Sequence, residues 1–232
     1  MEKLLSLLTL VALLCLGTLA YASDFSYEGS FVKDDEVQLF NFSIGTTSNV
    51  TLRTFSFTGG VNAHNSTILS GGFDPIVALF GGSEPLKGFY INHNDDNPSN
   101  PPDPVTGDSW DSYLNMSLTP GSYTVALMQY GNFYKSGTGN DAGPVFTRLG
   151  QGNYTAALEG GTAGIPFWIS DNEMNPPLGA TQRDGHWAID ILNVQNSTLG
   201  STIVTPEPVS SALFLLGGAA LAIKKRKAKI SA

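Results

Sequence analysis

Cysteine, basic side chains and charge in general are scarce in this chain. One cysteine occurs in 232 residues, so neither a disulfide framework nor a thiolate zinc cluster can form. Lys and Arg number 12 against 20 Asp and Glu, and the formal net charge of −8 argues against nucleic acid as a partner, because phosphate binding requires positive charge. A hydrophobic share of 41% still suffices for a core, and 26 Gly with 13 Pro indicate frequent turns. We therefore expect an acidic, turn-rich globular protein.

The N-terminus has the three parts of a secretory signal peptide. Lys3 supplies a positive charge, residues 4–20 form an apolar run, and Ala20-Tyr21-Ala22 fits the small-x-small pattern that signal peptidase cleaves. Cleavage after Ala22 would remove Cys15, the single cysteine. A permanent membrane anchor is the alternative, although the run is near the lower length limit for spanning a bilayer. Residues 1–22 are predicted to be a signal peptide.

The C-terminus combines a short motif, an apolar segment and a basic end. Pro206-Glu207-Pro208 precedes the apolar segment 209–223, which predicts a transmembrane helix. As a helix this segment rises about 22 Å, somewhat less than the roughly 30 Å hydrocarbon core. The positive-inside rule keeps the basic end in the cytoplasm and places residues 23–204 outside the membrane. The basic end consists of Lys224, Lys225, Arg226, Lys227 and Lys229.

This tail, residues 205–232, resembles the PEP-CTERM sorting signal of exopolysaccharide-producing Gram-negative bacteria. Pro206-Glu207-Pro208 stands where the motif that names the family stands, and the apolar length and basic end agree with it. The resemblance implies that an exosortase, a membrane transpeptidase, recognises and processes the tail. It implies export across the inner membrane, transient anchoring by the C-terminal helix, and final release to the outer surface or extracellular matrix. An ordinary C-terminal anchor is the alternative.

The body, residues 23–204, alternates short β-type segments with Gly, Asn and Pro clusters and has no sustained helical periodicity. We expect an all-β domain in which two antiparallel sheets pack as a β-sandwich or jelly roll. The body holds all but two of the acidic residues and half of the basic ones, so it is more acidic than the whole chain. The predicted strands are 25–31, 36–44, 49–58, 75–80, 88–91, 112–118, 122–130, 153–158 and 186–194.

Part of this body resembles the bacterial pre-peptidase C-terminal domain. The resemblance spans roughly residues 25–133 and implies a jelly-roll β-sandwich of the kind appended to secreted enzymes, with related versions found in front of PEP-CTERM tails. The segment 182–190 lies outside it and is predicted to be a closing strand. The words that carry the resemblance are FVKDDEVQLFNF at 31–42, GFDPIVALF at 72–80, NDD at 94–96, DSYL at 111–114 and LTPGSYTV at 118–125.

The loop 92–111 is dense in carboxylates and amides and contains no basic residue. Calcium takes about six to eight oxygen ligands from carboxylates, amides and backbone carbonyls, so this loop is a candidate site for a structural calcium ion. The pre-peptidase resemblance implies the same, because the Asn-Asp-Asp and Asp-Ser-Tyr positions flank a calcium site in some relatives. A solvated acidic loop without an ion is the alternative. The candidate ligands are Asn94, Asp95, Asp96, Asp108 and Asp111.

Catalytic motifs are missing from the sequence. His64, His93 and His186 are scattered, and neither a His-Glu-x-x-His motif nor a Gly-x-Ser-x-Gly elbow occurs. We therefore expect no enzyme, but an exported surface or matrix protein with a structural or adhesive role linked to exopolysaccharide. One alternative is a calcium-assisted carbohydrate-binding module in which exposed Trp or Tyr rings stack on sugars. A secreted hydrolase is the other, since any of the carboxylates could form a catalytic pair.

Overall fold

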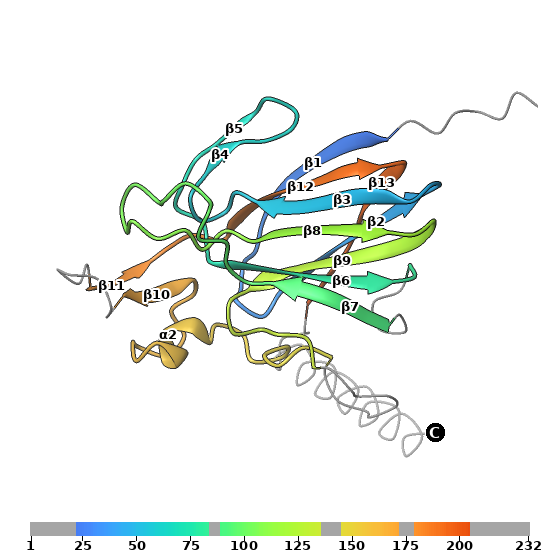
Figure 1. Cartoon of the computed structure of the whole chain (residues 1–232). Coiled ribbons are helices and arrows are strands. Elements are labelled where there is room, and N and C mark those ends of the chain that lie inside the picture. The colour runs from blue at the N-terminus through green and yellow to red at the C-terminus, as the bar shows by residue number, and fades with distance from the viewer. Residues whose placement is uncertain (1–21, 84–88, 136–144, 172–178, 205–232) are drawn as a thin grey trace, which may run out of the picture.

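The computed structural model describes residues 22–83, 89–135, 145–171 and 179–204, which form an antiparallel all-β body (Figure 1). The predicted signal peptide up to residue 21 and the predicted sorting tail, residues 205–232, lie outside the described residues. Within the described part, no helix is long and apolar enough to cross a membrane. The elements are β1 Ser23–Ser30, β2 Val37–Ile44, β3 Ser48–Thr54, β4 Gly60–Val61, β5 Thr67–Ile68, β6 Pro75–Gly81, β7 Phe89–Asn94, β8 Tyr113–Leu118, β9 Gly121–Gln129, α2 Thr155–Leu158, β10 Trp168–Asp171, β11 Gly179–Gln182, β12 His186–Val194 and β13 Asn196–Ile203.

Two large sheets build the body. One has the strand order β1-β12-β3-β8 and the other the order β13-β2-β9-β6-β7, with antiparallel pairing throughout both. Two small hairpins, β4-β5 and β10-β11, stand beside them (Figure 1). The expectation of an all-β fold with antiparallel sheets is therefore confirmed. The segment 182–190 contributes to β12, which lies inside its sheet between β1 and β3.

Apolar side chains of both sheets meet in one buried cluster, so the sheets pack face to face as a sandwich. Phe40 and Leu127 come from the five-stranded sheet, and Leu52, Trp187 and Ile189 come from the four-stranded one. The alternation in β9 points Leu127 into this cluster, as period two requires of a strand in a sandwich.

The outer face of the five-stranded sheet is buried as well. Ile76, Ala126 and Met128 pack against Phe146, which belongs to a segment that crosses this face after β9. As a result β6 is buried along its whole length, where simple alternation predicts a half-exposed strand.

One predicted strand, 153–158, is wrong. This segment forms the short helix α2, because the buried Asp34 carboxylate accepts hydrogen bonds from the backbone N–H groups of Tyr154 and Thr155 at 2.9 and 2.7 Å. A carboxylate at a helix N-terminus satisfies donors that have no partner inside the helix. Two predicted strands also end elsewhere, since β3 stops at Thr54 and β7 continues to Asn94.

Candidate metal centre

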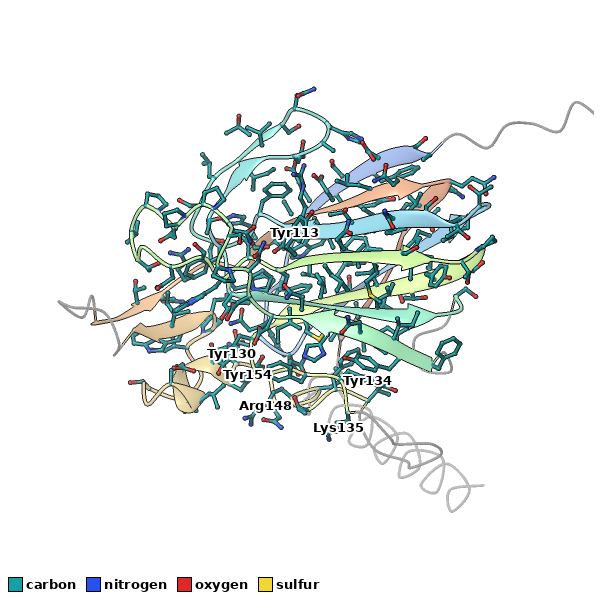
Figure 2. All side chains as sticks on the ribbon, in the orientation of Figure 1. Tyr113, Tyr130, Tyr134, Lys135, Arg148 and Tyr154 are labelled. Carbon is teal, nitrogen blue, oxygen red and sulfur yellow. The ribbon has the colours of Figure 1, made fainter. Side chains whose placement is uncertain are left out.

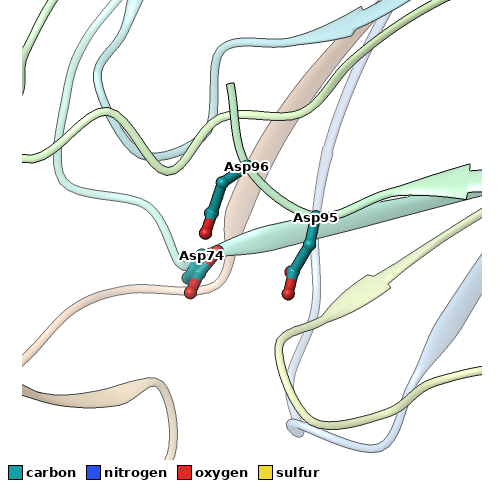
Figure 3. Close-up of side chains that lie close together, drawn as sticks. All are labelled: Asp74, Asp95 and Asp96. Atoms are coloured by element: carbon teal, nitrogen blue, oxygen red, sulfur yellow. The ribbon is translucent and has the colours of Figure 1, made fainter. Parts of the chain in front are cut away.

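Three aspartates converge where strand β6 begins and strand β7 ends (Figure 3). Asp74 immediately precedes β6, and Asp95 and Asp96 immediately follow β7. The two strands are antiparallel partners, with Val77 opposite Asn94, so the start of one lies beside the end of the other. Each aspartate offers a carboxylate oxygen, and these oxygens all lie within 4.8 Å of one another. We call these three residues the aspartate cluster.

Asp74 forms the buried base of the cluster. Its side chain is 7% exposed, and its Oδ1 atom is buried without a hydrogen-bond partner among the described residues. Burial raises the pKa of Asp74 well above its usual value, and the neighbouring charges of Asp95 and Asp96 raise it further. A buried ionised carboxylate without a partner is strongly unfavourable, so the site is poised to hold either a proton or a cation.

Asp95 and Asp96 complete the cluster toward the surface. Asp95 is half-buried, and one of its oxygens also lacks a hydrogen-bond partner in the described part of the chain. Burial, together with the charge of Asp96, raises the pKa of Asp95 to about 7. Asp96 is exposed, and partial desolvation and the charge of Asp108 raise its pKa. The opening of the site is therefore on the side of Asp96.

The hydroxyl of Ser112 fixes the backbone around the cluster. Its oxygen lies 2.8 Å from three carbonyl oxygens, those of Pro75, Asn94 and Asp95. Ser112 is fully buried and directly precedes β8. Because its contacts reach the start of β6 and the end of β7 together, Ser112 holds the segments that carry Asp74 and Asp95 side by side.

The other predicted ligands have different partners. The Asn94 side chain accepts a hydrogen bond from the Tyr113 N–H at 2.7 Å and donates one to the Asp96 carbonyl at 3.1 Å, so it shapes the loop. The Asp111 carboxylate accepts bonds from Thr54 Oγ1, from the Thr58 N–H and hydroxyl, and from the Phe57 N–H. Asp111 therefore clamps the turn after β3. Asp108 acts on the cluster through the charge that it places near Asp96.

A fifth loop aspartate, Asp103, forms a buried ion pair with Arg183. Its carboxylate receives two hydrogen bonds of 3.2 Å from the buried Arg183 guanidinium. Burial alone would raise the pKa of Asp103, but hydrogen bonds from Arg183 and Thr106 and the arginine charge lower it. The same guanidinium donates to the Gly72 and Phe57 carbonyls and lies over the Phe57 ring. Arg183 thus ties the acidic loop to the rest of the body.

The structure brings together Asp95 and Asp96 from the predicted set and adds Asp74. Asp74 lies outside the acidic loop 92–111 that the composition of the sequence points to. Only the antiparallel pairing of β6 with β7 places Asp74 beside Asp95 and Asp96. The sequence nevertheless pointed to Asp74, because it is the acidic residue of the segment GFDPIVALF and directly precedes the strand that begins at Pro75.

The residues predicted for processing fall mostly outside the described part. Ala22 is described, is exposed and directly precedes β1. Ala20, the motif Pro206, Glu207 and Pro208, and the whole basic end lie outside the described residues. Of the tryptophans considered for sugar stacking, Trp187 is 4% exposed in the inter-sheet core, and Trp110 packs on Phe57 with ring centroids 4.8 Å apart.

Comparison with known proteins gave one kind of match. No family model matches the chain, and no curated protein matches it. Four solved chains match, among them the crystal structure of the pre-peptidase C-terminal domain of collagenase from Bacillus anthracis. That match covers 72% of this chain and 88% of that chain, at 12% sequence identity and a TM-score of 0.33. This TM-score is too low to support a shared fold, so the description of the body as a β-sandwich depends on its two observed sheets.

Proposed function

We propose that this chain is an exported, non-enzymatic surface or matrix protein whose β-sandwich body binds one calcium ion at the aspartate cluster. The observation that supports the ion most is the buried Asp74 carboxylate, which has an oxygen without a hydrogen-bond partner among the described residues and faces two further carboxylates. A bound divalent cation would supply the missing partner and compensate three like charges at once.

Calcium suits these donors better than zinc or copper. The cluster contains only carboxylate oxygens, which are hard ligands, and no imidazole or thiolate. Two oxygens bound to one calcium ion at about 2.4 Å can lie up to about 4.8 Å apart, and the three carboxylates meet that limit. The ion's role in this proposal is structural, since it joins the start of β6 to the end of β7.

Calcium binding is tested directly by isothermal titration calorimetry on the full chain. We expect one site in the wild type and at least tenfold weaker binding in Asp74→Asn, which keeps the shape and removes the charge. Glu28→Gln is the matched control, because Glu28 is an exposed acidic residue on β1 in the other sheet. Equal affinities in wild type and Asp74→Asn would overturn the assignment.

The ends of the chain support the export and sorting part of the proposal. The signal peptide directs the body across the inner membrane, and exosortase processing at the Pro206-Glu207-Pro208 tail releases it to the exopolysaccharide-containing surface layer. Replacing these three residues by alanine should leave uncleaved protein in the membrane fraction. The mass of the mature protein is the measurement, and unchanged release of a trimmed form would argue against exosortase.

A further inference from the structure

The cation position has room for ligands that the protein does not supply. Calcium takes about six to eight oxygens, whereas three monodentate carboxylates provide only three of them. Asp74 is buried and Asp96 is exposed, so the remaining coordination positions of the ion face solvent on the side of Asp96. A ligand that carries neighbouring hydroxyl groups can replace water at such positions.

Tyr130 lies beside the aspartate cluster. It follows β9, and its backbone N–H donates a 2.8 Å hydrogen bond to the carbonyl of Asp74. The charges of Glu159 and of all three clustered aspartates act on its phenol. Its side chain is 36% exposed although the backbone is fixed, since the Tyr154 hydroxyl donates to the Tyr130 carbonyl at 2.6 Å. Figure 2 shows Tyr130 beside Tyr154 at this edge of the sheet.

Two more rings extend from Tyr130 across the end of the sheet. Phe133 lies with its ring centroid 6.2 Å from that of Tyr130, and His93 lies 6.0 Å from Phe133. His93 is exposed and lies on β7, two residues before Asp95 of the cluster. We call Tyr130, Phe133 and His93 the aromatic row. Tyr130 and His93 are exposed, whereas Phe133 is half-buried and packs against the core. An exposed aromatic ring offers an apolar face at little entropic cost, which suits the C–H face of a sugar ring.

We propose that the aromatic row and the open side of the cation site together bind an uncharged polysaccharide. One sugar ring packs on Tyr130, and two of its vicinal hydroxyl oxygens complete the calcium shell. The occupant is uncharged because the negative charges of Glu159 and Asp108 act on Asp74 and Asp96 in addition to the cluster's own, and this excess repels a polyanion. This inference rests on the proposed calcium site and names the ligand of that site.

Affinity electrophoresis of the full chain tests this binding surface. The gels contain galactomannan, dextran or xylan as uncharged probes, or hyaluronan as an acidic probe, with millimolar calcium or with EGTA. We expect wild-type protein to be retarded by at least one uncharged probe in calcium, with apparent affinity about tenfold lower in EGTA. We expect the same tenfold loss for Tyr130→Ala and Tyr130→Leu in calcium. Tyr130→Phe keeps the ring and should bind as wild type does.

Phe89→Ala is the matched control. Phe89 is 74% exposed on the same strand as His93 but at its other end, so its loss should leave retardation unchanged. Calcium calorimetry on each variant separates the two proposals. Normal calcium affinity without retardation by any uncharged probe overturns the binding surface and leaves the ion site standing. Absence of calcium binding overturns both, and retardation by hyaluronan alone overturns the uncharged occupant.

Discussion

Replacing Asp74 by asparagine should change stability in opposite directions with and without calcium. In EGTA at about pH 8, the cluster holds carboxylates whose oxygens lie within 4.8 Å of one another. Two unit charges at that separation repel by about 3.5 kcal/mol at an effective dielectric constant of about 20, and partial protonation relieves some of this cost. Asp74→Asn removes the most buried charge. We therefore expect the free energy of unfolding of the ion-free variant to be about 1–3 kcal/mol higher than that of wild type.

Calcium should reverse this order. At a free ion concentration of about 100 times the dissociation constant, wild type gains about 2.7 kcal/mol of stability, which corresponds to a melting temperature about 5–10 °C higher for a chain of this size. The variant should gain little. Differential scanning calorimetry in both buffers measures the two differences.

Asp111→Asn provides the contrast for this experiment. Asp111 lies outside the aspartate cluster, although its charge acts on Asp74, and it accepts hydrogen bonds from the Thr58 N–H at 2.7 Å and from the Thr54 hydroxyl at 2.8 Å. Its replacement removes these hydrogen bonds and should therefore lower the melting temperature in both buffers, unlike Asp74→Asn. The reasoning would be refuted if calcium left the melting temperature of wild type unchanged. It would also be refuted if Asp74→Asn were less stable than wild type in both buffers.

Three further predictions concern pH, packing and the α2 layer. Because the folded pKa of Asp95 is raised from 3.8 to about 7, the ion-free protein should lose stability as pH rises between these values, and urea midpoints should show a shallower loss in Asp95→Asn. Gly29→Ala would place a Cβ atom in steric overlap with the buried Trp187 ring, and should cost about 2 kcal/mol in urea unfolding. Asp34→Ala leaves three buried backbone N–H groups unpaired, so we expect a loss of about 4 kcal/mol and faster amide exchange around α2. An unchanged exchange rate there would contradict the assigned role of Asp34.

Alternating sequence predicts most strands of the sandwich correctly because packing of the two sheets follows the same period of two. In β12, Trp187, Ile189 and Ile191 all face the core, and the intervening Asp190 lies on the other face, where it pairs with Arg53 at 2.8 Å. Strand β13 escapes prediction because its sequence is mostly polar and its position follows from pairing with β2. Such pairing is a property of the assembled sheet.

The helix α2 shows where local sequence stops being informative. Tyr154 and Thr155 favour a strand, whereas Ala156, Ala157 and Leu158 favour a helix, and a carboxylate 120 positions earlier in the chain binds the N–H of Tyr154. A tertiary contact of this kind decides between conflicting local preferences. The aspartate cluster has the same origin, since loop composition points to Asp95 and Asp96 but only sheet register adds Asp74.

Because the aspartate cluster joins two paired strands, a bound cation would favour the correct register between them. A slip of one residue between β6 and β7 would turn every side chain of one strand to the opposite face, and Asp95 would no longer approach Asp74. The pairing also contains a bulge between Leu79 and Phe80, which shifts the register once along the pair. A calcium ion that binds only the native alignment would stabilise that alignment alone. Ion binding would then be coupled to the pairing of β7 with β6 at the edge of the sheet.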